Sequence, residues 1–231
     1  MFDTAYFLDT FSRLIPGVPL TFFLATLSYL VGGIIGFLMA LVRLYQVRFF
    51  SQCVVVYVSF FRGTPLLVQL FMFYYGIPIF LKSLGLQFNF ALLDAIYYAL
   101  VIFSLYASAY LADIFRSALL AVDKGQKEAA LSVGMTSFQA LKRIILPQAL
   151  MITLPNLLNF FIIQIKNTAL ASIITVADLM GLADIESGRS SKFLEVYLMA
   201  ALLYWAMCLF LEGVFTLFEK RFSKFRKAYN A

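Results

Sequence analysis

Long hydrophobic stretches separated by short polar segments dominate this chain. The clearest runs from Pro19 to Leu41, 23 residues without a charge, and is followed by Arg43 and Arg48. An α-helix of about 20 apolar residues crosses the ~30 Å hydrocarbon core of a bilayer, so this stretch predicts a transmembrane helix. Four further stretches repeat the pattern. We predict five spans, at about 17–42, 51–81, 91–118, 147–177 and 193–219.

Two of the five predicted spans carry interruptions. The second stretch, Phe49 to Leu81, contains Arg62-Gly63-Thr64-Pro65. Thr64 can cap a helix and Pro65 can start one, so a break or bend is expected there. The fourth span begins at Pro147, contains Pro155 and is expected to be disturbed near Lys166-Asn167.

Composition supports a membrane protein without a separate soluble domain. The 231 residues are 63% hydrophobic and 13% charged, against roughly 45–50% apolar in soluble domains. We therefore predict an all-α, polytopic membrane protein forming one transmembrane domain over residues 1–231. The chain has no histidine, the commonest general base and metal ligand. Cys53 and Cys208 lie in separate apolar segments, which indicates neither redox chemistry nor a zinc site.

The basic residues predict orientation in the membrane. The net charge is +6, but Lys and Arg lie between hydrophobic blocks, so we expect no binding to nucleic acid. Twelve of the 18 fall on one side of the five-span arrangement and four on the other, which places the N-terminus outside and the C-terminus in the cytoplasm. The cytoplasmic set is Arg43, Arg48, Arg116, Lys124, Lys127, Lys142, Arg143, Lys220, Arg221, Lys224, Arg226 and Lys227; the outer set is Arg13, Lys82, Arg189 and Lys192.

The cytoplasmic segment from Asp123 to Pro147 predicts two helices joined by a glycine. Asp123 is a good N-cap with Gln126 three residues later, and Thr136 is followed by Gln139 in the same pattern. Gly134 suits a left-handed C-terminal cap. A helix over about 124–134, followed by a second one, would stand out of the membrane as an elbow.

The same segment resembles the EAA loop of ABC importer permeases. Glu128-Ala129-Ala130, Gly134 and the ending Ile144, Leu146 and Pro147 occur at that family's spacing. The resemblance implies the type I ABC importer permease fold, with five transmembrane helices and a cytoplasmic coupling helix that docks into an ATP-binding subunit. The coupling residues that it implies are Glu128, Ala129, Ala130, Leu131, Gly134 and Met135. A helix lying flat on the bilayer surface is the alternative.

Polar residues inside the apolar stretches are the candidates for a substrate pathway. An Arg or Lys at the bilayer centre costs about 2.5–3.5 kcal/mol, so Arg62 and Lys166 need partners or a function. The segment from Phe60 to Phe71 and the segment Lys166-Asn167-Thr168-Ala169-Leu170 resemble the polar amino-acid branch of these permeases, although Ala169 replaces a usual serine. The pathway candidates are Arg62, Thr64, Gln69, Gln164, Lys166, Asn167 and Thr168. Pairing of Arg62 and Lys166 with carbonyl groups, or snorkelling to an interface, is the competing interpretation.

Two acidic features are open to a structural explanation. Asp113, where the branch usually has glutamate, and Arg116 lie one helical turn apart and predict a surface ion pair. Asp178, Asp184 and Glu186 on the outer side could receive a soluble binding protein or could form a solvated loop.

The resemblance implies the permease subunit of an amino-acid ABC importer in a bacterial cytoplasmic membrane. Its partners would be two ATP-binding subunits, a second permease subunit, identical or not, and an extracytoplasmic amino-acid-binding protein. This chain would bind no cofactor, since ATP and Mg would belong to the ATPase, and it has no GxxxxGK[ST] loop. An ion-coupled secondary transporter is the alternative, and an intramembrane enzyme is disfavoured. Phe193 to Tyr197 and the pair Tyr204-Trp205 resemble cystine-type members, with basic amino acids as the other candidate substrates.

Overall fold

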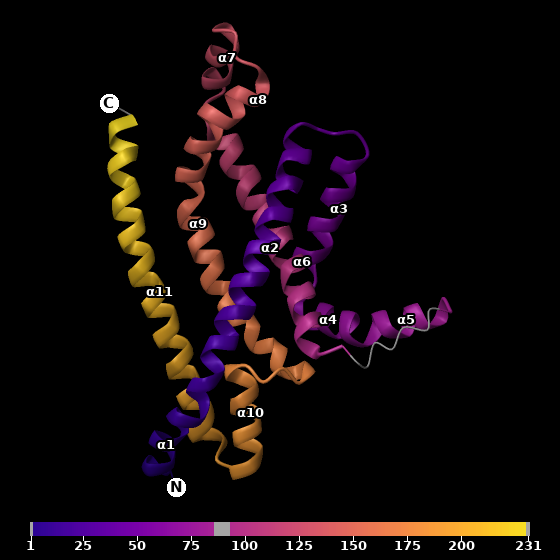
Figure 1. Ribbon diagram of the computed structural model, residues 1–231, viewed down its shortest axis with the longest axis vertical. Helices are drawn as coiled ribbons and strands as arrows, with labels where there is room; N and C mark the ends of the chain where they lie inside the picture. The colour runs from indigo at the N-terminus through magenta and orange to yellow at the C-terminus, as the bar shows by residue number, and fades with distance from the viewer. Residues whose placement is uncertain (1, 86–92, 230–231) are drawn as a thin grey trace.

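The computed structural model describes residues 2–85 and 93–229, with side chains up to residue 217, and every regular element in these ranges is helical (Figure 1). The first two residues of the predicted span 91–118 lie outside the described residues. Five helical runs in the described ranges are long and apolar enough to cross a membrane, which confirms the predicted class. They are Thr4–Leu44, Leu66–Ser83, Ala95–Ala121, Ser137–Ile174 and Phe193–Leu217.

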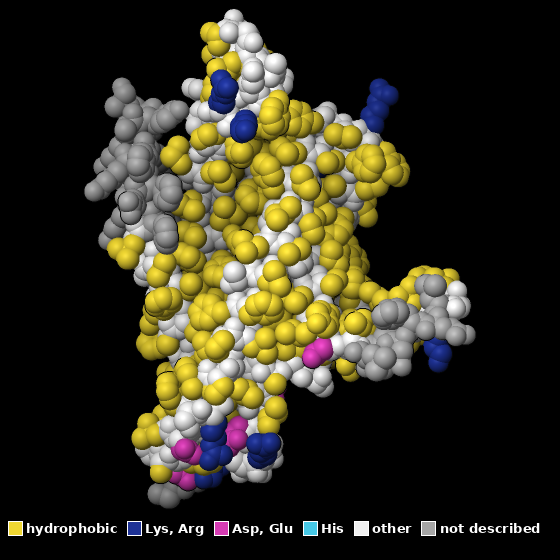
Figure 2. Space-filling view, viewed as in Figure 1, with side chains coloured by type: hydrophobic (Ala, Val, Ile, Leu, Met, Phe, Trp, Pro, Cys, Tyr) yellow, Lys and Arg dark blue, Asp and Glu magenta, His cyan; other side chains and the backbone are white. Residues whose placement is uncertain are grey.

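The long helices run lengthwise, and the short ones lie at the two ends and on one side of the bundle. In Figure 1, α2 (Val18–Leu44), α6 (Ala95–Ala121), α9 (Leu146–Asn167) and α11 (Phe193–Tyr229) span the long axis. One end carries α7 (Lys124–Ser132) and α8 (Ser137–Ala140), and the opposite end carries α1 (Thr4–Leu14) and α10 (Leu179–Ser190). On the face shown in Figure 2, apolar side chains cover the middle, and charged side chains gather mainly near the ends. This distribution suits a protein that crosses a bilayer.

Helices α2 and α6 form the centre of the bundle because small residues let their backbones meet. A Cβ added at Gly32 would lie 2.7 Å from the Cβ of Ala107, and one added at Gly36 would lie 2.7 Å from the carbonyl oxygen of Ser108. Glycines four residues apart are a common device for close helix packing in membranes, where apolar burial alone gives little drive for association. We call this contact the glycine seam. Phe103 and Ile102 of α6 are buried in the core of the bundle.

The predicted second span, 51–81, is two helical segments that meet at a sharp bend. Helix α3 (Phe50–Gly63) ends at the predicted break, and α4 (Leu66–Phe71), a π-helical turn η2 (Met72–Gly76) and α5 (Ile77–Ser83) run across its direction (Figure 1). Thr64 takes an extended conformation, φ −116° and ψ 146°, as expected for a residue before proline. Contrary to the prediction, Thr64 does not cap α4: Pro65 is its N-cap, and the Thr64 hydroxyl donates to the carbonyl of Phe60 at 2.8 Å.

The fourth predicted span continues directly from the elbow. A π-helical segment, η4 (Leu141–Ile145), joins α8 to α9, which accommodates Pro147 in its first turn and Pro155 in its interior. The disturbance predicted near Lys166-Asn167 is confirmed, because α9 ends at Asn167 and tightens into a 3-10 helix, η5 (Thr168–Ile174). Thr175 then ends this run in a left-handed conformation, φ +72°.

The end of the molecule opposite the elbow is held by polar contacts between distant segments. A 3-10 turn, η1 (Ile15–Gly17), joins α1 to α2. Glu186 of α10 accepts hydrogen bonds from Tyr6 and from Arg13, the latter at 2.7 Å. Lys192 donates to Asp3 at 2.6 Å, and this bond holds the pKa of Asp3 below its ordinary value. We call Asp3, Tyr6, Arg13, Glu186 and Lys192 the outer network.

Candidate functional site

The elbow, residues 123–145, is stiffened by caps at each turn. The Asp123 carboxylate accepts from the backbone N–H of Gly125 at 2.7 Å and starts α7. Beyond α7, the N–H of Gly134 donates to Leu131 at 3.0 Å and that of Met135 donates to Ala130 at 3.1 Å, the two bonds of a Schellman motif. Gly134 has φ +84°, and no atom of the described residues lies within 4 Å of a Cβ added there. The turn therefore needs glycine for its backbone conformation and not for space.

The second turn of the elbow carries the complete capping box. The Thr136 hydroxyl accepts from the N–H of Gln139 at 3.2 Å, and the Gln139 side chain accepts from the N–H of Thr136 at 2.9 Å. The Asp123–Gln126 pair was also predicted to form a box, but Asp123 bonds to Gly125 instead. The π-helical turn η4 follows at once, a geometry often found at functional positions in helices.

The surface of the elbow differs in detail from the predicted coupling face. Glu128, Ala129 and Gly134 are exposed, whereas Ala130 is buried against the rest of the elbow and Met135 is half-buried. The most exposed apolar side chains are Val133 at 75% and Phe138 at 69%, and sequence reasoning selected neither of them. An apolar residue within a polar loop was the signal that could have found them. Figure 2 shows apolar side chains on this tip.

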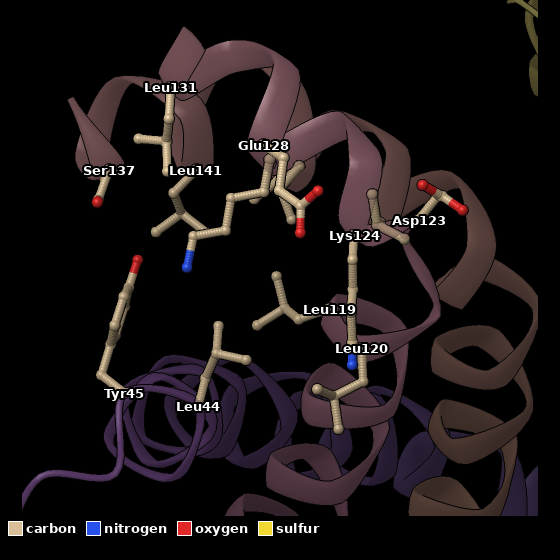
Figure 3. A pocket seen from close by; sticks show the side chains of 13 residues that line it. Leu44, Tyr45, Leu119, Leu120, Asp123, Lys124, Glu128, Leu131, Ser137 and Leu141 are labelled. Atoms are coloured by element: carbon tan, nitrogen blue, oxygen red, sulfur yellow. The ribbon is translucent and has the colours of Figure 1, made fainter. Parts of the chain in front are cut away.

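A groove of about 440 Å³ separates the elbow from the ends of α2 and α6. Figure 3 shows Leu44 and Tyr45 rising from α2, with Glu128 and Leu131 of α7 facing them from above. Leu119 and Leu141 line the inner side and pack with Ala118 and Ala149. The elbow is thus a stiff body that joins the bundle through its connections to α6 and α9 and through this small apolar cluster.

A second polar site joins three helices in the half of the bundle nearer the elbow. The Asp113 carboxylate of α6 is bound by two guanidinium groups, from Arg43 of α2 at 2.5 Å and from Arg62 of α3. The Arg62 guanidinium also lies over the ring of Tyr110, 5.3 Å from its centroid. The predicted pair of Asp113 with Arg116 is wrong, because the two arginines of neighbouring helices take both carboxylate oxygens. We call Arg43, Arg62 and Asp113 the arginine–aspartate cluster.

Aromatic rings connect this cluster to α9. The ring of Tyr110 stacks on Phe160 with centroids 5.3 Å apart and lies 4.7 Å from Tyr106. Asn167 lies beside Tyr106, and its side-chain nitrogen is buried without a hydrogen-bond partner among the described residues. The structure therefore brings Arg62 and Asn167, two pathway candidates, to one column of aromatic rings.

The remaining pathway candidates lie elsewhere. Gln69 is buried at the bend, where its amide nitrogen donates to the carbonyls of Phe61 and Thr64 and to the Thr64 hydroxyl, the last at 2.7 Å. Gln164 and Thr168 are buried inside the bundle, and Gln164 donates to the Ser28 hydroxyl at 2.9 Å. Lys166 is exposed and faces a separate groove with Tyr197 and Tyr204.

The outer acidic residues are mostly internal. Asp178 is fully buried, caps α10 through the N–H of Gly181 at 3.0 Å and accepts from Thr21 at 3.1 Å. Burial raises the pKa of Asp178, and the hydrogen bonds oppose that shift. Glu186 is buried in the outer network, and Asp184 accepts from the Tyr197 hydroxyl at 2.9 Å. Neither predicted alternative, a site that receives a binding protein or a solvated loop, fits Asp178 and Glu186, because helix packing and not solvent surrounds them.

Comparison with known proteins gives concordant matches over nearly the whole chain. The sequence pattern of the binding-protein-dependent transport system inner membrane component matches residues 32–224. The probable amino-acid ABC transporter permease protein PatM of Vibrio harveyi is 40% identical over 99% of this chain and 98% of its own length. The L-cystine transport system permease protein TcyL of Bacillus subtilis is 39% identical over 96% of this chain and 92% of its own. A crystal structure of an amino acid ABC transporter with histidines superposes with a TM-score of 0.84 at 33% identity, over 96% of this chain and 99% of that one.

Proposed function

This chain belongs to the family of binding-protein-dependent transport system inner membrane components, and on that premise we propose that it carries a cystine-type amino acid into the cytoplasm. It is the permease subunit of an amino-acid ABC importer and a multi-pass protein of the inner membrane. It works with an ATPase and a binding protein, and permease subunits of this family hydrolyse no ATP and bind no cofactor themselves. The alternative of an ion-coupled secondary transporter is set aside.

The elbow is the observation that carries the proposed mechanism. Its two turns are fixed by the Schellman motif at Gly134 and the capping box at Thr136, so a force on α7 is passed on instead of being absorbed. We assign docking to the predicted residues, with Glu128 as the exposed charge, and add Val133 and Phe138 as exposed apolar contacts. Since α6 leads into α7 and α9 follows η4, docking of an ATPase acts on two spans at once.

The proposed topology follows from the ends at which the elements lie. The elbow and the end of α11 share one end of the molecule, and the N-terminal helix lies at the other (Figure 1). With the basic residues of the elbow in the cytoplasm, the N-terminus lies outside. Two ATP-binding subunits would then dock at the elbow end of two permease subunits, and a substrate-loaded binding protein would approach from the side of α1 and α10.

The proposed substrate contacts are Arg62 and Asn167. A cystine-type amino acid carries carboxylate and ammonium groups, and a guanidinium is the side chain best suited to hold a carboxylate. The Arg62 side chain is 46% exposed, and Asn167 beside the same aromatic column has a buried amide nitrogen without a hydrogen-bond partner among the described residues. The cystine-type assignment rests on the similarity to the L-cystine permease TcyL and on the resemblance of Phe193 to Tyr197 and Tyr204-Trp205 to cystine-type members.

Reconstitution tests the proposal directly. The purified permease, its ATPase and its binding protein are placed in liposomes, and uptake of radiolabelled cystine is followed with ATP inside, with ATP omitted, and with a sodium or proton gradient alone. ATP-dependent uptake that unlabelled cystine suppresses, and that arginine and lysine do not, is the expected result. Uptake driven by an ion gradient without the ATPase would contradict the mechanism, and preferential suppression by arginine would reassign the substrate to basic amino acids.

A further inference from the structure

We infer that Arg43 is a positioning residue for substrate passage: it holds the Asp113 carboxylate while Arg62 exchanges that carboxylate for the carboxylate of the amino acid. The inference rests on the proposed function and deepens it, because it assigns a role to a residue that makes no proposed contact with substrate. It starts from the geometry of the arginine–aspartate cluster.

Each arginine of the cluster has its own oxygen. Arg43 binds Oδ1 of Asp113 at 2.5 Å, and Arg62 binds Oδ2. Neither guanidinium forms an ion pair with another carboxylate in residues 2–85 and 93–217. The cluster therefore holds two positive charges and one negative charge, and the departure of one arginine leaves the other bond intact.

The two arginines differ in freedom. The Arg43 side chain is 17% exposed and lies at the end of α2, which the glycine seam fixes against α6. The Arg62 side chain is 46% exposed, lies in the last turn of α3 beside the bend, and rests on the Tyr110 ring. Arg62 is thus the partner that can turn away, and Arg43 is the one that stays.

The second arginine makes the exchange feasible. A half-buried carboxylate that loses its only cationic partner in a membrane pays a desolvation penalty that opposes the movement. With Arg43 in place, Asp113 remains paired when a second carboxylate engages Arg62. Without Arg43, Asp113 would hold Arg62 more tightly and would compete with the substrate for it. A purely structural clamp between α2, α3 and α6 is the competing explanation.

Direct binding of substrate separates the two explanations. Radiolabelled cystine is titrated onto the purified permease–ATPase complex without binding protein, and the apparent melting temperature of each variant is measured in parallel. We expect Arg43→Gln to weaken cystine binding about tenfold, as removal of a charge that governs a competing ion pair would. Arg43→Lys, which keeps the charge, should retain most of the affinity. Arg48→Gln is the matched control, because its exposed side chain forms no ion pair in the described part of the chain.

The double variant decides the matter. If Asp113 competes for Arg62, then Arg43→Gln combined with Asp113→Asn should bind cystine more tightly than Arg43→Gln alone, because the competitor has been neutralised. A structural clamp predicts the opposite, since the double variant loses both ion pairs and should be the least stable and the weakest binder. Unchanged cystine binding in Arg43→Gln would overturn this inference alone, whereas a wild-type importer that transports no cystine would overturn the proposed substrate and the inference together.

Discussion

The outer network and the elbow are both small polar regions at the ends of an apolar bundle, but they are built in opposite ways. In the outer network, side chains more than 170 residues apart in sequence bind one another, as Arg13 does with Glu186 and Asp3 with Lys192. In the elbow, the ordering bonds join residues no more than five positions apart, as in the Schellman motif at Gly134. The charged side chains of the elbow, Glu128 among them, form no ion pair within the described ranges.

The difference teaches how one chain combines an end held together by long-range contacts with an end ordered by local bonds. Long-range ion pairs and a hydrogen bond tie α1 to α10 and to the start of α11. Local caps keep the elbow rigid in itself, and its connections to α6 and α9 and one apolar cluster join it to the bundle. Substitutions should therefore separate into those that change stability and those that change coupling.

The largest expected effect is at the turn of the elbow. Gly134→Val places a β-branched residue at φ +84°, where even an unbranched residue costs roughly 1–2 kcal/mol. We expect nearly complete loss of ATP-driven uptake in liposomes, with the permease still inserted and its melting temperature lowered by only about a few degrees, because the strain distorts the coupling turn and leaves the bundle intact. Gly134→Asn is the matched control, since asparagine tolerates the left-handed conformation and should keep most of the uptake. Full activity of the valine variant would show that the turn does not transmit force.

A crossed pair of glutamate substitutions gives the next largest effect. Glu186→Ala removes hydrogen bonds to Tyr6 and Arg13, so we expect a loss of about 1–3 kcal/mol of stability and a fall of several degrees in apparent melting temperature. Uptake per folded molecule should remain. Glu128→Ala should leave the melting temperature unchanged and abolish stimulation of the ATPase by loaded binding protein. If Glu186→Ala instead abolished ATPase stimulation and Glu128→Ala lowered the melting temperature, the assignment of stability to the outer network and of coupling to the elbow would be wrong.

The smallest expected effect concerns the pH dependence of stability at Asp178. Burial raises its pKa in the folded state, so its contribution to stability is fully present below the unfolded value, about 3.9, and is lost as the pH rises through the folded value. Asp178→Asn does not titrate. The melting temperature of the variant minus that of the wild type should therefore be more positive at about pH 8 than at about pH 4, by roughly a few degrees at most. An equal difference at both values would show that the carboxyl titrates as it does in the unfolded chain.

The sequence allowed the local parts of this structure to be predicted and left the long-range parts open. Asp123, Gly134, Thr136 and Pro65 each act on their own neighbours, so the elbow and the bend could be located from single residues. The partners of Asp113 could not be predicted in this way. Arg43 lies 70 positions away and Arg62 lies 51 positions away, and only the packing of three helices brings them together.

The prediction for Glu186 failed for the same reason. An acidic residue in a short segment between two spans is ordinarily solvated, and nothing local shows that Tyr6 and Arg13 cover it. The sequence analysis did not select Gly32 and Gly36, and the sequence does not say which helix approaches them. The candidate site shows the same difference between local and long-range features. The coupling turn at Gly134 was predicted from the sequence, and the ion pairs around Arg62 were not.

The glycine seam between α2 and α6 has a mechanical consequence. Two spans whose backbones touch cannot slide past each other without a clash, so they behave as one rod. One tip of that rod carries α7, and at the other tip Thr21 of α2 binds Asp178 and the N–H of Leu179. If the ATPase tilts the elbow when it binds nucleotide, the rigid pair of helices would move the start of α10 as well. That start lies about 30 Å or more from the elbow, at 1.5 Å per helical residue. In that arrangement a rigid-body movement of α2 and α6 couples the two ends of the molecule, and no chain of small side-chain shifts is needed between them.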